Sequence, residues 1–264
     1  MTYEEFNDLA INPPYIEQDS VYRIDVHCYG DPIDESQYEV RISHAFIYLD
    51  LESCHVKLKQ IVTDISLKDT LFALYVYQLP LGKDISPNLH QRLWVYDRFG
   101  NLNSQSRCTA MIEDIDHPSA KFRGHTPDSI RFSPGDIVEV YDRENQCAKL
   151  AVVIKRPLTV EQCWDERKHV ELACRLQGIQ SEFTDDNYWL YADSDTYLLA
   201  DGPDFRKNTF SSPSYDVFTL SRPLSADLRN TFAEFYNNVI EGIKRSQENT
   251  YRCIKEIHRL ADLL

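Results

Sequence analysis

The segment that most constrains the fold covers residues 130–157 and reads IRFSPGDIVEVYDRENQCAKLAVVIKRP. Pro134-Gly135 is a turn-forming pair, and strand-like alternation follows it over 137–141. The polar DREN stretch predicts a second turn before 148–154, an apolar run of strand length. We therefore predict a β-hairpin, which places this part of the chain in an antiparallel sheet.

Other runs of strand length occur before and after this hairpin, separated by turn-forming residues that include DRFGN at 97–101. Their order and spacing favour an antiparallel meander. In the run LFALYVYQLP both faces are apolar, so we expect Leu74 and Val76 to lie on one covered face and Tyr75 and Tyr77 on the other. The predicted strands are 21–29, 38–51, 55–62, 71–80, 91–100, two short strands around the ADSD turn at 192–195, and 215–220.

Three segments have helical patterns. A capping box formed by Thr2 and Glu5 predicts a short helix that ends before Pro13. An apolar stripe over 160–177 predicts a second helix, and Ser225 is placed to cap a long final helix. The apolar face of the final helix should cover a sheet; its residues are Leu228, Phe232, Phe235, Tyr236, Val239, Ile240 and Ile243.

Beyond this face the final helix narrows to a heptad seam of alternating four- and three-residue steps. Ile254 and Ile257 lie on the seam and are candidate binding residues. A seam of this kind packs within its own chain, against another protein, or against a second copy of the chain.

These patterns predict an α+β fold: an antiparallel, strand-rich body with a short N-terminal helix, a mid-chain helix and a long C-terminal helix. The polar stretch 113–129 contains two prolines and one glycine, which is typical of a connector. We predict a β-rich domain over 1–120, a hairpin domain over 121–224 that includes the mid-chain helix, and the final helix over 225–264.

The net charge is −14, with 28 basic and 42 acidic residues, which opposes contact with nucleic acid. The seven cysteines are odd in number and scattered, as reduced thiols are. The acidic first residues lack the positive and apolar regions of a signal peptide, and apolar runs near 18 residues are absent. We therefore expect a cytoplasmic protein that does not contact membranes.

The familiar motifs for nucleotide binding, zinc proteolysis, serine hydrolysis and calcium binding are absent from the sequence. His27-Cys28 and Cys54-His55 are pairs of good metal ligands, but neighbouring side chains in a strand point to opposite faces. We predict no metal site and no cofactor.

The densest group of catalytic residue types lies in the connector. Paired carboxylates beside an imidazole can activate water or hold a divalent ion. The alternative is a solvated polar loop, and we favour it because nothing in the sequence indicates a pocket. The weak catalytic candidates are Asp114, Asp116, His117 and His125.

Aromatic residues supply the remaining binding candidates. Tyr188, Trp189 and Tyr191 fall in a predicted strand, where exposed rings anchor a protein or ligand and buried rings form core.

The stretch FRGHTPDSIRFSPGDIVEV, followed by LAVVIKRPLTVEQ, resembles a segment of uncharacterised bacterial proteins with no known activity, over about residues 122–227. The hairpin alone resembles the opening of small SH3-like barrels. That resemblance implies binding of peptides or nucleic acid through an aromatic groove, and the acidic surroundings favour a protein partner.

We accordingly expect a non-enzymatic, cytoplasmic protein-interaction module that engages a protein through its aromatic strands or C-terminal seam, including a second copy through the final helix. One alternative is a metal-dependent hydrolase that uses the acidic and histidine loop. The other is an acidic mimic of nucleic acid that inhibits a basic partner.

Overall fold

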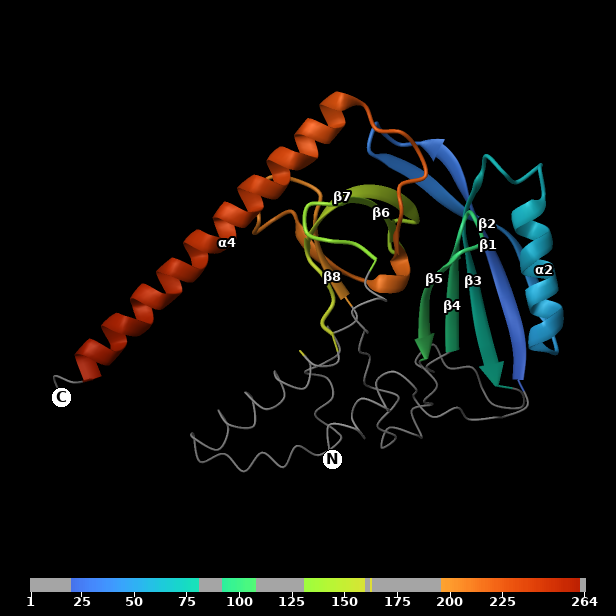
Figure 1. The fold of residues 1–264 in the computed structure, drawn as a ribbon, viewed down its shortest axis with the longest axis horizontal. Helices are drawn as coiled ribbons and strands as arrows, with labels where there is room; N and C mark the ends of the chain where they lie inside the picture. The colour runs from blue at the N-terminus through green and yellow to red at the C-terminus, as the bar shows by residue number, and fades with distance from the viewer. Residues whose placement is uncertain (1–19, 81–91, 108–130, 160–161, 163–195, 262–264) are drawn as a thin grey trace.

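The computed structural model of the chain describes residues 20–80, 92–107, 131–159, 162 and 196–261 (Figure 1). Within these ranges the backbone forms one ten-stranded sheet, two α-helices and a short 3-10 helix. The elements are β1 (Ser20–Pro32), β2 (Gln37–Tyr48), α2 (Leu51–Thr63), β3 (Leu71–Pro80), β4 (Arg92–Asp97), β5 (Leu102–Arg107), β6 (Ile137–Asp142), β7 (Cys147–Lys155), β8 (Thr196–Ala200), β9 (Thr209–Pro213), η5 (Ser214–Asp216), β10 (Val217–Phe218) and α4 (Ala226–Ala261).

The strand order is β10-β6-β7-β2-β1-β3-β4-β5, with β8 added to β7 and β9 added to β8. Every pair in this sheet is antiparallel. β7 therefore has three neighbours: β6 along one side, and β2 and then β8 along the other. The two halves of the chain meet where β2 pairs with the start of β7.

In the N-terminal half, α2 covers one face of β1, β3 and β4 (Figure 1). Ile24 and Val26 from β1 and Leu74 and Val76 from β3 meet the buried face of α2 in one hydrophobic cluster. Tyr75 points to the opposite face, where it is fully buried, and Tyr77 beside it is half-buried. The predicted division of β3 into two covered faces is confirmed.

The prediction of a strand over 55–62 is wrong, because these residues belong to α2. Asp50 caps the helix by accepting a hydrogen bond from the Ser53 backbone N–H at 2.6 Å. The apparent alternation came partly from Val56, which is exposed on the helix surface. The buried residues instead follow helical spacing: Cys54, Leu58 and Ile61.

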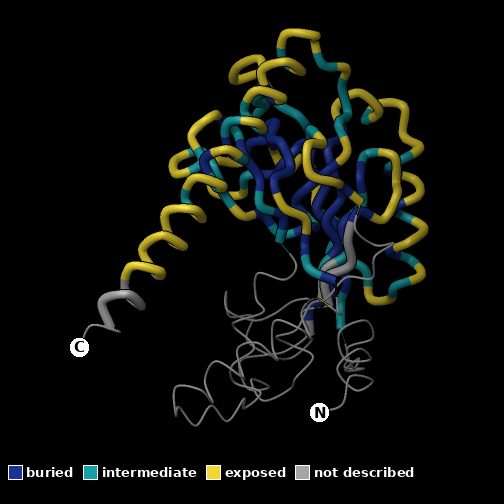
Figure 2. The backbone as a smooth tube through the Cα atoms, turned by 60° about the vertical axis from the view of Figure 1, so that its left-hand side comes forward, coloured by how far each residue is buried: buried dark blue, intermediate teal, exposed yellow. Residues whose placement is uncertain are grey.

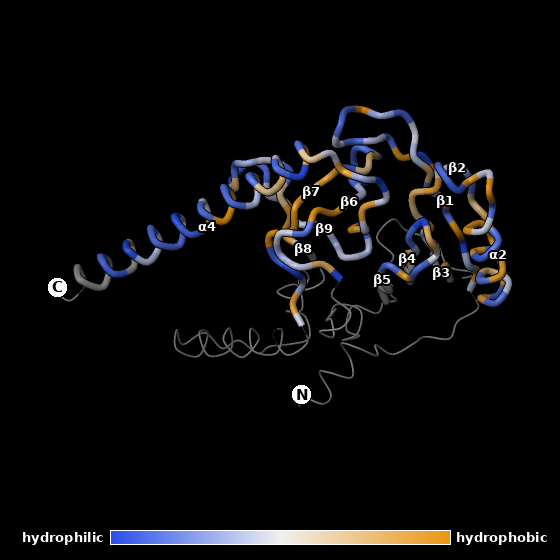
Figure 3. The backbone as a smooth tube through the Cα atoms, turned by 45° about the horizontal axis from the view of Figure 1, so that its top comes forward, coloured by the Kyte–Doolittle hydropathy of each residue, from blue (hydrophilic) through white to orange (hydrophobic). Residues whose placement is uncertain are grey.

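In the C-terminal half, α4 covers one face of β6, β7 and β8 (Figure 1). The other face of these strands packs on itself around Val140, Val153 and Leu199. Hydrophobic backbone segments are concentrated in β6 and β7, whereas the second half of α4 is hydrophilic (Figure 3). The predicted apolar face of α4 is confirmed, with Phe232 and Val239 buried at its centre.

The predicted hairpin is confirmed by the full pairing of β6 with β7, and the meander of β3, β4 and β5 is confirmed as well. The α+β class is correct for the described residues. The second strand predicted around the turn at 192–195 is confirmed as β8. The predicted N-terminal helix, most of the 160–177 helix, the first strand before that turn and the domain boundary at 120 lie outside the described residues. No helix in the described part of the chain is both long and apolar enough to cross a bilayer.

Gly242 permits the loop after β8 to lie against α4. A Cβ atom added at this position would stand 2.5 Å from Cδ1 of Phe205, far inside van der Waals contact. Glycine at this helical position therefore reflects the packing of one aromatic ring.

We predict that Gly242→Ala destabilises the fold by about 1–2 kcal/mol, because the ring must move, although alanine favours helices by about 1 kcal/mol. Urea unfolding measures this free energy. In a Phe205→Ala background the sign should reverse, with Gly242→Ala stabilising by about 1 kcal/mol. A stabilising effect in the wild-type background would contradict the packing argument.

Candidate functional site

A buried polar network lies where the two halves of the chain meet. The Asp216 carboxylate of η5, only 2% exposed, accepts a hydrogen bond from the Tyr75 hydroxyl at 2.8 Å. Arg143, in the turn between β6 and β7, donates to both of its oxygens, from Nε at 2.6 Å and from Nη2 at 2.9 Å. Such a bidentate pair is strong and geometrically specific.

Aromatic rings surround the Arg143 guanidinium. Its central carbon lies 5.1 Å from the ring centroid of Tyr75, 5.3 Å from that of Tyr215 and 5.8 Å from that of Tyr141. Cation–π attraction therefore adds to the ion pair.

Burial sets the electrostatics of this network. It raises the pKa of the Asp216 carboxyl, although the hydrogen bonds and charge of Arg143 oppose the rise. It also raises the pKa of Tyr75 well above the usual value, assisted by the nearby Asp216 charge. For Arg143, burial alone would lower the pKa, but its hydrogen bonds to Asp216 keep the value raised.

His27 of β1 packs beside the network without joining it. The imidazole is 3% exposed, and neither ring nitrogen has a hydrogen-bond partner among the described residues. Its ring centroid lies 4.5 Å from that of Tyr75 and 5.1 Å from that of Tyr141. Burial lowers the pKa of His27 to about 4, so the side chain is neutral at pH 7.

A second buried carboxylate joins the same two halves. Glu139 of β6, 1% exposed, accepts hydrogen bonds from the Tyr29 hydroxyl at 2.9 Å and the Ser221 backbone N–H at 3.0 Å. Arg222 lies over the ring of Tyr38 at 4.1 Å and approaches Glu139 with Nε at 3.7 Å from Oε1. Burial, with the Glu139 charge, raises the pKa of Tyr29.

Each of these carboxylates is held by a cation and by a phenol, so their chemistry is that of a fixed cross-link. A general base needs a free lone pair that can accept a proton, and access to substrate. In this network the charged groups instead pair with one another where the two halves of the chain meet. We therefore assign it to positioning of the two halves.

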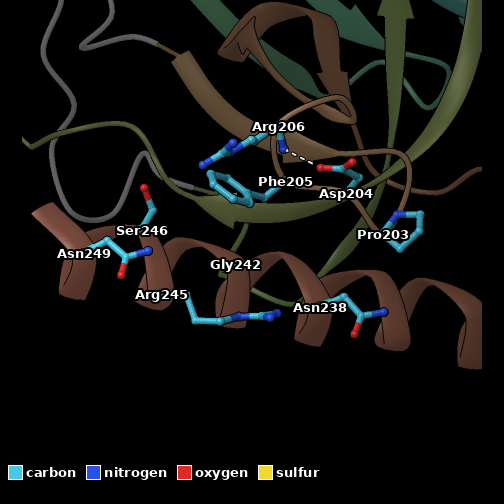
Figure 4. Close-up of a pocket in the computed structure, with 9 residues that line it drawn as sticks. All are labelled: Pro203, Asp204, Phe205, Arg206, Asn238, Gly242, Arg245, Ser246 and Asn249. Carbon is cyan, nitrogen blue, oxygen red and sulfur yellow. Dashed lines mark hydrogen bonds between the residues drawn. The ribbon is translucent and has the colours of Figure 1, made fainter.

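Two pockets lined by described residues lie at the edges of the fold. The first, of about 470 Å³, lies between the loop after β8 and α4 and is lined by polar and cationic side chains that include Arg206, Asn238 and Arg245 (Figure 4). The second, of about 390 Å³, lies between α2 and the turn after β4. Its lining is more apolar and includes Leu58, Tyr96 and Phe99.

Two larger surfaces stand exposed. From Lys244 onward α4 extends beyond the sheet, and its described side chains are mostly exposed (Figure 2). Tyr251 on this part of the helix is 71% exposed. The second surface is the outer edge of β2, where Ile42 is 56% and Ile47 66% exposed.

The structure leaves most of the predicted site residues untested. Asp114, Asp116, His117 and His125 lie outside the described residues, as do Tyr188, Trp189 and Tyr191. The backbone at Ile254 and Ile257 is helical within α4, as predicted. Among the described residues, no three His, Cys, Asp or Glu side chains come together as metal ligands would.

Sequence patterns did not indicate the junction network. Tyr75 and Asp216 are 141 residues apart, and neither belongs to a recognisable motif. The sequence indicates His27 only as a potential metal ligand beside Cys28. The two side chains do point to opposite faces, since the His27 ring packs against Tyr75 while Cys28 lies in the cluster under α2.

Comparisons of the chain with protein-family models, with curated proteins and with solved structures find no match. Its function is therefore inferred from its own geometry.

We predict that stability falls by about 2–3 kcal/mol between pH 7 and pH 4.5 because of His27. The unfolded imidazole binds a proton near pH 6.5 and the folded one only near pH 4, so acid favours the unfolded chain. His27→Phe should remove this part of the pH dependence in urea unfolding. His55→Gln, a change at an exposed imidazole, is the control; equal slopes for wild type and His27→Phe would refute the assignment.

A second prediction concerns Asp216. Asp216→Asn should destabilise the fold by about 2 kcal/mol, because the buried side chain loses its charge-assisted hydrogen bonds to Arg143, whose side chain is 42% exposed. Tyr75→Phe should cost about 1 kcal/mol, the value of one hydrogen bond. Thermal or urea unfolding gives both numbers, with the exposed Glu35→Gln expected within about 0.5 kcal/mol of wild type. If Asp216→Asn matched that control, the network would not join the halves.

Proposed function

We propose that the chain is a non-enzymatic protein-interaction module of the cytoplasm, and that the outer half of α4 binds its protein partner. The observation that carries this proposal is the length of α4 beyond its packed face. α4 has 36 residues, and the last residue of its hydrophobic cluster is Ile243. The remainder projects away from the sheet (Figure 1).

The exposed half of α4 needs packing contacts to remain helical. At 1.5 Å per residue, the segment after Ile243 is about 27 Å long. Helices of this length are marginal in water on their own, because most helical stability in proteins comes from tertiary packing of one face. A partner that covers the seam would supply that packing.

The seam specifies the kind of contact. Spacing of four and three residues continues through Gln247, Thr250, Ile254 and Ile257, which favours another helix packed alongside. The charged residues Arg252, Lys255 and Glu256 occupy heptad positions off the seam.

The strand order supports an SH3-like barrel as the body that carries this helix. β6, β7, β8 and β9 follow one another as an antiparallel meander, η5 comes next, and β10 returns to pair with β6. We include this barrel in the proposal as a scaffold. The buried thiols of Cys28, Cys54 and Cys147 support a reducing compartment.

The test passes a cytoplasmic extract of the source organism over four immobilised proteins: the wild-type chain, two full-length variants and a truncated chain. It then compares the proteins that each of them captures. Wild type and Lys255→Asp, a charge change off the seam, should retain the same protein. Ile254→Asp/Ile257→Asp and a chain ending at Ile243 should lose it. With that protein purified, the double variant should raise the dissociation constant by at least about a hundredfold, since it buries two unpaired charges.

Retention of the protein by the truncated chain would place binding elsewhere and reject this role for α4. Circular dichroism of each variant checks that the body remains folded.

A further inference from the structure

One edge of the sheet ends abruptly in the middle of β2. β7 pairs with β2 only through Gln37–Glu39, and the Val40 N–H then donates to the Gln146 carbonyl at 2.8 Å. From Arg41 to Tyr48, β2 pairs with β1 alone among the described strands. Asp50 then caps α2. Eight residues of β2 therefore present an open edge bounded by β7 and α2.

This edge lacks most of the features that protect exposed strands. Natural edges are commonly guarded by lysines, prolines, bulges or a covering element. The sequence of the open stretch, RISHAFIY, contains neither lysine nor proline and has one charged residue, Arg41. Ile42 and Ile47 are both more than half exposed. An edge of this composition favours pairing with another strand.

A β-bulge brings these two isoleucines to the same face. Residues five apart in a regular strand point to opposite faces. Here Ile42 pairs with His27 and His44 pairs with Val26, so Ser43 is an extra residue between them. Ile47 pairs with Arg23. His27 contacts Tyr75 and Arg23 contacts Tyr77, both on the face of the sheet opposite α2.

We propose that this edge pairs with the same edge of a second copy, antiparallel and about a two-fold axis, to form a dimer with one continuous sheet. β7 and α2 bound the open stretch at its two ends. Full overlap of the stretch with its own copy therefore sets Arg41 opposite Tyr48 of the partner subunit. In that register Ile42 lies opposite Ile47 of the partner subunit, and the symmetric pair forms as well.

The side-chain chemistry of this register is complementary. Two Ile–Ile pairs form an apolar cluster on one face. Arg41 meets a tyrosine ring, which favours a cation–π contact. Like charges do not face each other along the stretch, because Arg41 is its one charged residue. The two-fold symmetry uses both edges, so the assembly closes at two copies.

Sedimentation equilibrium of the full chain at about 150 mM salt tests the proposal, because this ionic strength screens the repulsion between two acidic chains. Wild type should be a dimer. Ile42→Lys and Ile47→Glu, each alone, should raise the dissociation constant at least about tenfold by burying unpaired charges. The double variant Ile42→Lys/Ile47→Glu should recover dimerisation, since each lysine then faces a glutamate.

The exposed Val56 lies on α2, off this edge, and Val56→Lys is the matched control that should remain dimeric. Monomeric wild type at about 100 µM would overturn the proposal, and so would a double variant weaker than either single variant. The chain ending at Ile243 separates this inference from the role of α4. It should still dimerise, and a dimer lost on truncation yet unaffected by Ile47→Glu would assign self-association to α4.

Discussion

The Arg143–Asp216 pair is the interaction on which the joined sheet most depends. β2 and β7 share only three paired residues, a short ladder between two halves. The bidentate pair and the Tyr75 hydroxyl fix β3, η5 and the turn after β6 in one arrangement. Glu139 also joins the two halves, through the hydrogen bonds that it accepts from Tyr29 and Ser221. Because both carboxylates are buried, each depends on its partners, and loss of one leaves an uncompensated charge.

Polar contacts at this junction specify geometry in a way that apolar packing alone does not. The aromatic cluster around Tyr75, Tyr141 and Phe218 supplies buried area, and many orientations of rings give similar burial. A guanidinium that must meet two carboxylate oxygens accepts few orientations. With the halves held in this way, the open edge of β2 and the free end of α4 keep fixed positions on one body.

Local patterns predicted much of the sheet and the covered half of α4, because alternation and helical stripes report the face that each element buries. They failed at 55–62, where Val56 mimicked alternation although Asp50 and the spacing of Cys54, Leu58 and Ile61 indicated a helix. Local patterns could not predict the polar network where the two halves meet. Whether Asp216 faces Arg143 depends on strand order, and strand order is a property of the whole chain. The bulge at Ser43 likewise became visible only through the register of β1 with β2.

The pairing of β7 with strands from both halves of the chain bears on how the protein folds. β2 and its neighbour β7 are separated by about a hundred residues of chain, and Tyr29 reaches Ser221 across 192 residues. Contacts so distant in sequence carry a large entropic cost of loop closure and form slowly. During synthesis the N-terminal strands are made well before β7, and for that interval β2 lacks β7 along its whole outer edge. The nascent chain therefore passes through a stage in which strand pairing between molecules competes with completion of its own sheet.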